Sequence, residues 1–188
     1  MASHGKHTTC ALLVSVLLLV SPAAAQTAAI TYITVSNTND DLLLYASLQG
    51  AFTEQIKQAV LSGTTTSIVF IILLKQERFL WFDDKIADIN VVHSIAYDKV
   101  KKEFVVRRSW RNSEPEITSS FEEAQMLVSR IESLKIIPLS RIAKGSQYQL
   151  QIKAEASRKT LPLGLNTVLF FMSFWDVSTD WYIIDFTY

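Results

Sequence analysis

The stretch SIVFIILL, residues 67–74, decides the fold of this chain. After the first serine every residue is apolar, and four of the eight are Ile or Val, whose branched side chains favour strands. A run of this length and composition suits a strand buried on both faces better than a helix. We therefore expect residues 67–74 to form the central strand of a sheet.

The residues before this run predict a hairpin and a helix. Residues 30–38 alternate Ile and Tyr with Thr and Ser, residues 39–40 are Asn-Asp turn chemistry, and residues 42–48 suit the partner strand. In residues 51–62 apolar side chains recur every four positions, and Gly63 follows as a C-terminal cap. We expect a helix there with one buried stripe.

The residues after the run continue the β pattern. Residues 79–82, FLWF, read as a strand end that meets a polar turn. Residues 86–97 and 103–110 form a hairpin around an Asp-Lys-Val-Lys turn, and residues 112–118 are expected to be a loop.

A second helix is predicted to start at a capping box. Ser120 is followed three residues later by Glu123, which is the spacing in which the two residues cap each other's backbone. Apolar residues with helical spacing then extend through Ile131 and Leu134, so we expect the helix to stop only before Pro138.

Two further strands, residues 148–156 and residues 181–186, complete the expected fold. The fold class is α+β and mainly β: about seven mostly antiparallel strands, in one sheet or a sandwich, with two helices packed against it. No repeat or linker divides residues 26–188, so we expect a single domain.

The N-terminus reads as an export signal. Lys6 precedes an apolar stretch at residues 11–20, and the small residues Ala23 to Ala25 follow. This pattern predicts a cleavable signal peptide over residues 1–25 and a periplasmic or secreted mature domain. The alternative is an uncleaved N-terminal anchor. The apolar stretch itself is short of the roughly 20 residues that span a bilayer.

Composition narrows the class of protein. Lys6 is the only charged residue of the leader, which leaves 17 basic and 18 acidic residues in the mature chain. This balance argues against a nucleic-acid binder. The only cysteine, Cys10, lies in the leader, so the mature domain has neither disulfide nor thiol chemistry, and its 49% hydrophobic content must supply a core. We expect no transmembrane helix after the leader.

Catalytic chemistry is poorly represented. His93, the only histidine of the mature chain, lies between apolar alternation partners and is read as a structural hydrogen-bonding residue. The carboxylate pairs Asp83-Asp84 and Glu122-Glu123 suit a turn and a helix start better than a glycosidase pair. We predict no catalytic residues, no metal site and no cofactor.

Two sets of aromatic residues are candidate binding sites. Residues 161–175 form an uncharged, largely apolar segment, which either lies in the core or docks on a membrane interface or a partner. The candidate interaction surface comprises Phe170, Phe171, Phe174, Trp175, Trp181 and Tyr182. The candidate apolar pocket comprises Phe79, Trp81 and Trp110.

Six basic residues cluster around the turn at residues 98–101 and along the strand after it. They either protect a solvated sheet edge or form a patch for an anionic partner. The six are Lys99, Lys101, Lys102, Arg107, Arg108 and Arg111.

The order of residues resembles a family of exported bacterial proteins, the domain of unknown function 4390. The match is carried by AFTEQIKQAVLSG at residues 51–63, FLWFD at residues 79–83, and LPLGL followed by SFWDVSTDWY within residues 161–182. The longer apolar insert at residues 168–174 departs from the family pattern. The resemblance implies an exported domain, offers no established activity or catalytic residues to carry over, and favours an accessory role beside a membrane sensor.

The function expected from these features is recognition. We predict an exported, non-catalytic binding domain of the bacterial cell envelope whose partner is an envelope protein or the membrane interface. A carrier of a small apolar ligand or lipid is the alternative, and a hydrolase is less favoured.

Overall fold

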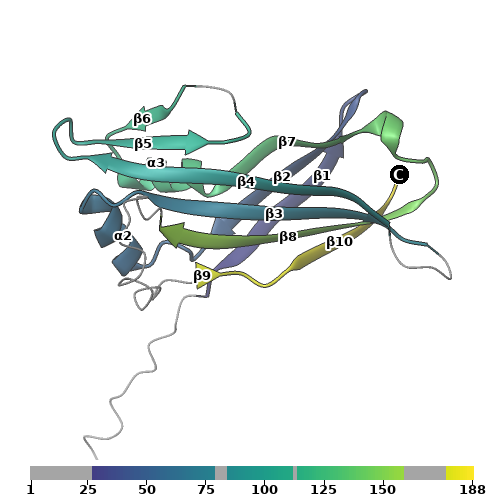
Figure 1. The fold of residues 1–188 in the computed structure, drawn as a ribbon, viewed down its shortest axis with the longest axis horizontal. Coiled ribbons are helices and arrows are strands. Elements are labelled where there is room, and N and C mark those ends of the chain that lie inside the picture. The colour runs from purple at the N-terminus through teal and green to yellow at the C-terminus, as the bar shows by residue number, and fades with distance from the viewer. Residues whose placement is uncertain (1–26, 79–83, 112–113, 159–176) are drawn as a thin grey trace, which may run out of the picture.

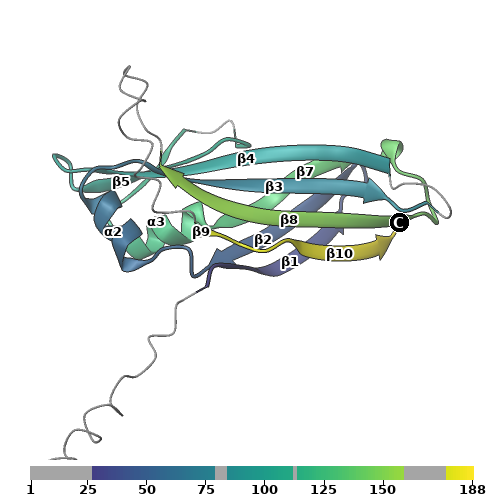
Figure 2. The same ribbon diagram turned by 60° about the horizontal axis from the view of Figure 1, so that its bottom comes forward.

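The computed structural model of the chain describes residues 27–78, 84–111, 114–158 and 177–188. In these residues two β-sheets pack face to face, and two helices lie together at one end (Figure 1). Figure 2 shows the smaller sheet crossing the larger one obliquely.

The larger sheet has seven antiparallel strands in the order β10-β8-β3-β4-β5-β6, with β9 also paired to β8. The predicted central strand, β3, lies between β8 and β4 and is paired along its whole length with both. The strands are β3 (Thr66–Gln76), β4 (Asp84–Asp98), β5 (Glu103–Arg108), β6 (Glu116–Thr118), β8 (Gln147–Arg158), β9 (Val177–Ser178) and β10 (Tyr182–Thr187).

The smaller sheet has the order β1-β2-β7, with β1 (Ala29–Asn37), β2 (Asp41–Gln49) and β7 (Arg130–Pro138). Relative to β2, β1 carries one extra residue and β7 carries two, and one irregularity of β7 lies at nearly the same level of the sheet as that of β1. At this level the extra residues lie next to Tyr32 in β1 and Ser133 in β7, whose φ angles of 51° and 56° are in the left-handed region. These are β-bulges, which increase the twist of a strand and re-aim its side chains.

The helices are α2 (Glu54–Leu61) and α3 (Phe121–Val128), and a 3-10 turn, η2 (Leu139–Arg141), follows β7. Each helix begins at a capping hydroxyl: Thr53 accepts from the backbone N–H of Ile56, and Ser120 accepts from that of Glu123. The sequence predicted both helices, although α2 starts three residues later than expected.

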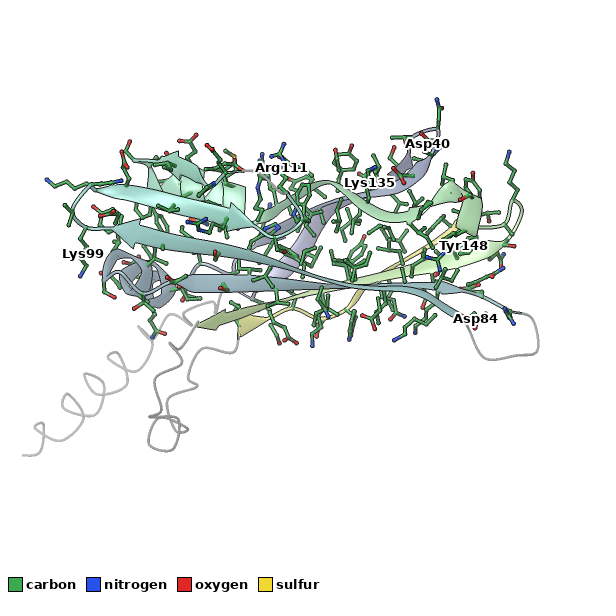
Figure 3. The ribbon with its side chains drawn as sticks, turned by 45° about the horizontal axis from the view of Figure 1, so that its top comes forward. Asp40, Asp84, Lys99, Arg111, Lys135 and Tyr148 are labelled. Atoms are coloured by element: carbon green, nitrogen blue, oxygen red, sulfur yellow. The ribbon has the colours of Figure 1, made fainter. Side chains whose placement is uncertain are left out.

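The core lies between the sheets. On the inner face of β3, Ile68, Phe70, Ile72 and Leu74 are fully buried, and side chains from both sheets, including Tyr148, fill the space between them (Figure 3). The outer face of β3 is only half-buried. The expectation of a strand buried on both faces is therefore wrong, because one of its faces has no packed layer over it in the described residues.

The predicted fold class is confirmed: the described residues are mainly β, with ten strands in antiparallel sheets and two α-helices. Two local predictions are wrong. The second helix ends at Val128 rather than before Pro138, and the residues that follow form β7. The expected loop at residues 112–118 contains the short strand β6.

The error at β7 has a physical cause. Ile131 and Leu134 are both buried against β2, and the bulge at Ser133 places them three residues apart rather than two. A bulged strand therefore imitates the i, i+3 spacing of a helix. Across the described residues no helix is long and apolar enough to cross a membrane.

Candidate functional site: the C-terminal edge strand

The structure describes three of the nine aromatic residues singled out in the sequence. Trp181 and Tyr182 of the candidate interaction surface lie at β10, and Trp110 of the candidate pocket lies after β5. The others fall outside the described residues: Phe79, Trp81, Phe170, Phe171, Phe174 and Trp175.

Thr179 fixes the chain where it passes from β9 to β10. Its side chain is buried, and its backbone N–H donates to the Ala154 carbonyl at 2.9 Å. Its hydroxyl accepts from the Ala154 N–H at 3.0 Å and donates to the Asp180 carbonyl at 2.9 Å. One threonine therefore replaces a pair of ladder hydrogen bonds on β8 and sets the position at which β10 begins.

Three consecutive apolar side chains emerge directly after this anchor. Trp181, Tyr182 and Ile183 are 41%, 46% and 49% exposed. The ammonium of Lys153 lies 5.6 Å from the centre of the Trp181 ring, a cation–π contact that orients the indole and leaves part of it in solvent. We name Trp181, Tyr182 and Ile183 the edge triad.

The backbone of β10 also has a free side. Tyr188 donates its N–H to Ser146 at 3.2 Å, so its backbone groups point toward β8. In an antiparallel ladder this direction alternates from residue to residue. The N–H and C=O groups of Ile183, Asp185 and Thr187 consequently face the open edge, which no other described strand covers.

The far half of β10 is held firmly in place. Phe186 stacks on the buried ring of Tyr148 at a centroid distance of 5.8 Å, and Gln149 donates to the Asp185 carboxylate at 3.0 Å. Tyr148 in turn accepts from the backbone N–H of Ala143 at 2.8 Å. The exposed triad is therefore presented by a rigid strand rather than by a loose tail.

Trp110 is engaged in the core. Its indole N–H donates to Nε2 of the fully buried His93 at 2.8 Å. Nε2 must then carry a lone pair, so the ring proton resides on Nδ1 and is donated to the Val128 carbonyl, also at 2.8 Å. Burial lowers the pKa of His93 from 6.5 to about 4, and the Val128 hydrogen bond offsets only part of that effect. This agrees with its interpretation as a hydrogen-bonding core residue.

The basic cluster does not form one surface patch. Arg107 is exposed, whereas the side chain of Arg108 is only 2% exposed and pairs with Glu116 on β6 and, at 3.5 Å, with Glu132 on β7. Assigning Arg108 to a solvated edge is therefore wrong, because it faces inward with its alternation partners on β5. Arg111 lies 3.9 Å from Glu116.

The carboxylates considered for catalysis have structural partners. Asp84 is exposed at the start of β4 and pairs with Arg78, and Asp83 lies outside the described residues. Glu122 accepts from Ser120 at 3.0 Å, and bonds from the helix start lower its pKa. Glu123 accepts from Thr118. In the described ranges no three His, Cys, Asp or Glu side chains are grouped so that they could hold a metal ion.

A family model described as a domain of unknown function, DUF4390, matches residues 25–185. The chain belongs to the DUF4390 family. This confirms the resemblance seen in the sequence, which covers nearly all of the chain after the leader. No curated protein and no solved structure gave a match.

Sequence reasoning missed two residues of this DUF4390 domain that matter to its edges. Ile183 was assigned only to a closing strand, because whether a strand lies at an edge depends on pairings far apart in sequence. Arg108 carried a usable signal. It alternates with Phe104 and Val106, which are both buried, so its inward direction could have been read from the period-2 pattern.

Proposed function

We propose that this DUF4390 domain is an exported, non-catalytic binding module of the bacterial cell envelope, which recognises an envelope protein through the open edge of β10. The observation that carries the proposal is the edge triad, three exposed apolar side chains at the start of a strand whose outward backbone groups have no partner among the described residues. An extended segment of a partner can add to such an edge as a further strand, with main-chain hydrogen bonds for affinity and side chains for specificity.

The composition of β10 supports this mode of binding. Soluble proteins usually protect an open sheet edge with lysines, prolines or a very short strand. The six residues of β10, YIIDFT, include a single charge and no proline. An unprotected edge of this kind can pair with the edges of other chains, which leads to aggregation unless a partner covers it.

The N-terminal leader supports the proposed location of the domain in the cell envelope. Residues 1–25 have the basic start, apolar core and small-residue end of a secretory signal, and the family match begins at residue 25. Mass spectrometry of the protein recovered from the periplasm is expected to find Gln26 at its N-terminus. Its recovery in the cytosol with Met1 still attached would contradict export. An accessory role beside a membrane sensor is the most specific form of the proposal.

The binding mode can be tested by photo-crosslinking in cells. Tyr182 is replaced by p-benzoylphenylalanine, which keeps an aromatic ring at the exposed edge. Irradiation should give a discrete protein adduct. The substitution Ile183→Pro removes one N–H from the open edge and none from the ladder with β8, so it should abolish the adduct while the domain stays folded.

Ile117, which is 59% exposed on β6, gives the matched control. The same photoreactive residue at position 117 reports on the opposite edge of the same sheet and should give no adduct. Equal adducts from positions 117 and 182, or an adduct from position 182 that survives Ile183→Pro, would count against recognition through β10.

The carrier alternative stays a prediction. Its pocket was assigned to Phe79, Trp81 and Trp110, of which the structure describes Trp110 alone. The space between the sheets is filled by packed side chains in the described residues. Mass spectrometry of the gently purified protein would detect a retained lipid.

A further inference from the structure

A hollow of about 500 Å³ lies between the bulged end of the smaller sheet and helix α3. This volume is in the range of ligand sites, which hold an apolar surface together with a few convergent polar groups. Its walls include Tyr32, Ser47 and Gln49 from the sheet side, and Gln125, Met126 and Arg130 from α3 and the start of β7. Its strands β1, β2 and β7 belong to the smaller sheet, whereas β10 lies at the edge of the larger one.

The bulge in β1 places Tyr32 at this hollow. The register of β1 against β2 slips by one residue between Thr31 and Thr34, and Tyr32 takes a φ of 51°. An aromatic residue is strained in this left-handed region, where Gly or Asn is the ordinary choice. The ring is nevertheless 78% exposed, so no burial offsets the strain. Strained residues cluster at functional sites, which makes Tyr32 a candidate ligand contact.

Several polar side chains that line the hollow are available to bind a ligand. In the described part of the chain, no side-chain hydrogen bond or ion pair involves Tyr32, Gln49, Gln125 or Arg130. Some charged groups on other surfaces are paired, such as Lys135 with Asp41 at 2.6 Å. The Arg130 guanidinium therefore stands free at the rim, beside an exposed tyrosine and the 42% exposed side chain of Met126.

The opposite wall carries Glu122, but its carboxylate is already engaged. It accepts from the Ser120 hydroxyl at 3.0 Å at the start of α3, where the helix N-terminus stabilises negative charge. Of the two charged side chains that line the hollow, Arg130 is thus the one without a side-chain partner among the described residues. A guanidinium is the side chain best suited to a carboxylate, which it can bind through two parallel hydrogen bonds.

We propose that this hollow is a second binding site of the domain, and that it takes an extended acidic peptide whose carboxylate pairs with Arg130 while a neighbouring apolar residue lies between Tyr32 and Met126. The site does not depend on the function proposed for β10. Gly50 contributes to its wall: a Cβ there would lie 2.7 Å from the Thr27 carbonyl oxygen, so this part of the wall stays without a side chain.

The test uses the mature domain and two fluorescein-labelled heptapeptides, GSFEFSG and GSFKFSG, which differ only in the charge of the central residue. Fluorescence polarisation should show binding of the Glu peptide and at least tenfold weaker binding of the Lys peptide. Arg130→Gln should weaken binding of the Glu peptide at least tenfold. Trp181→Ser, at the edge of the other sheet, should leave it unchanged.

Tyr32→Asn separates a ligand contact from a structural role. Asn tolerates a positive φ, so the thermal midpoint should stay the same or rise, while peptide binding should fall at least tenfold. The proposal is overturned if the Glu peptide does not bind at millimolar concentration, if the Lys peptide binds equally well, or if neither variant changes the affinity. Arg130-dependent flotation with phosphatidylglycerol vesicles, without peptide binding, would also overturn it.

Discussion

At one margin of the larger sheet lies β6, three residues long, and at the other lies β10, which has six residues and follows directly from Trp181 (Figure 1). Pro115 precedes β6, Glu116 pairs with the buried Arg108, and Thr118 bonds to Glu123 of α3. By contrast, β10 has one charge, a free line of backbone groups and the edge triad.

The contrast indicates that the two edges serve different purposes. A short strand tied by ion pairs cannot easily accept another chain, whereas a longer strand with a single charge can. In the larger sheet, the β6 edge is therefore protected against pairing and the β10 edge is not. Changes on the β6 side should act mainly on stability, and changes on the β10 side mainly on association.

The largest effect is expected from Arg108→Ala. The substitution leaves Glu116 and Glu132 without their shared cation and opens space beneath β5, so the free energy of unfolding should fall by about 3 kcal/mol. Urea denaturation measures the loss, and hydrogen exchange should show faster exchange of the β6 amides. The exposed neighbour Arg107→Ala is the control and should change stability by less than about 0.5 kcal/mol. Equal losses from both variants would contradict the assigned role of Arg108.

The second-largest effect concerns His93, which lies on β4, on the β6 side of the larger sheet. Its pKa is about 4 in the folded protein and near 6.5 when unfolded, so the unfolded chain binds more protons between these values. Stability should therefore fall as the pH is lowered, by about 2 kcal/mol from about pH 7.5 to about pH 5. Urea midpoints across that range test this. The loss should be much smaller in His93→Gln, and identical slopes for the two proteins would be evidence against a neutral buried imidazole.

The sequence predicted the strands whose residues follow a regular strand pattern. It misassigned β7, a strand in which a bulge gives the buried residues a helical spacing. Residues 67–74, 86–97 and 148–156 all became strands, because their composition and alternation agree with their pairing. At β7 the bulge changed the spacing of buried residues, and a helical pattern was read into a strand. Local pattern cannot reveal a bulge, which is defined by the register of a strand against its neighbour.

The candidate site was predictable only in part. The aromatic character of Trp181 and Tyr182 was visible in the sequence, and both side chains are exposed. Their position at an edge was not visible, because it depends on which of the described strands pair with β10. The strained conformation of Tyr32 likewise follows from pairing across β1 and β2, and nothing in the residues around it predicts a left-handed φ.

A smaller effect is expected at the anchor of the open edge. Thr179→Val keeps the shape of the side chain but removes the hydroxyl that accepts from Ala154, which should lower the free energy of unfolding by about 1 kcal/mol. Hydrogen exchange should show the amides of β10 opening before the rest of the sheet. Ser178→Ala changes an exposed hydroxyl one residue earlier and should alter neither quantity. Uniform protection of β10 in Thr179→Val would show that the anchor is dispensable.

The smallest effect on stability is expected from Ile183→Lys. This substitution is also the most direct test of the difference between the β6 and β10 edges. A lysine at this exposed position gives β10 the protection that sheet edges ordinarily have, and stability should stay within about 0.5 kcal/mol. The photo-crosslink from position 182 should disappear, and any self-association at high concentration, followed by analytical ultracentrifugation, should weaken. Ile117→Lys places the same charge on β6, where pairing is already blocked, and should change neither readout. If both lysine variants behave alike, the two edges do not differ in the way their sequences suggest, and the triad is an ordinary exposed surface.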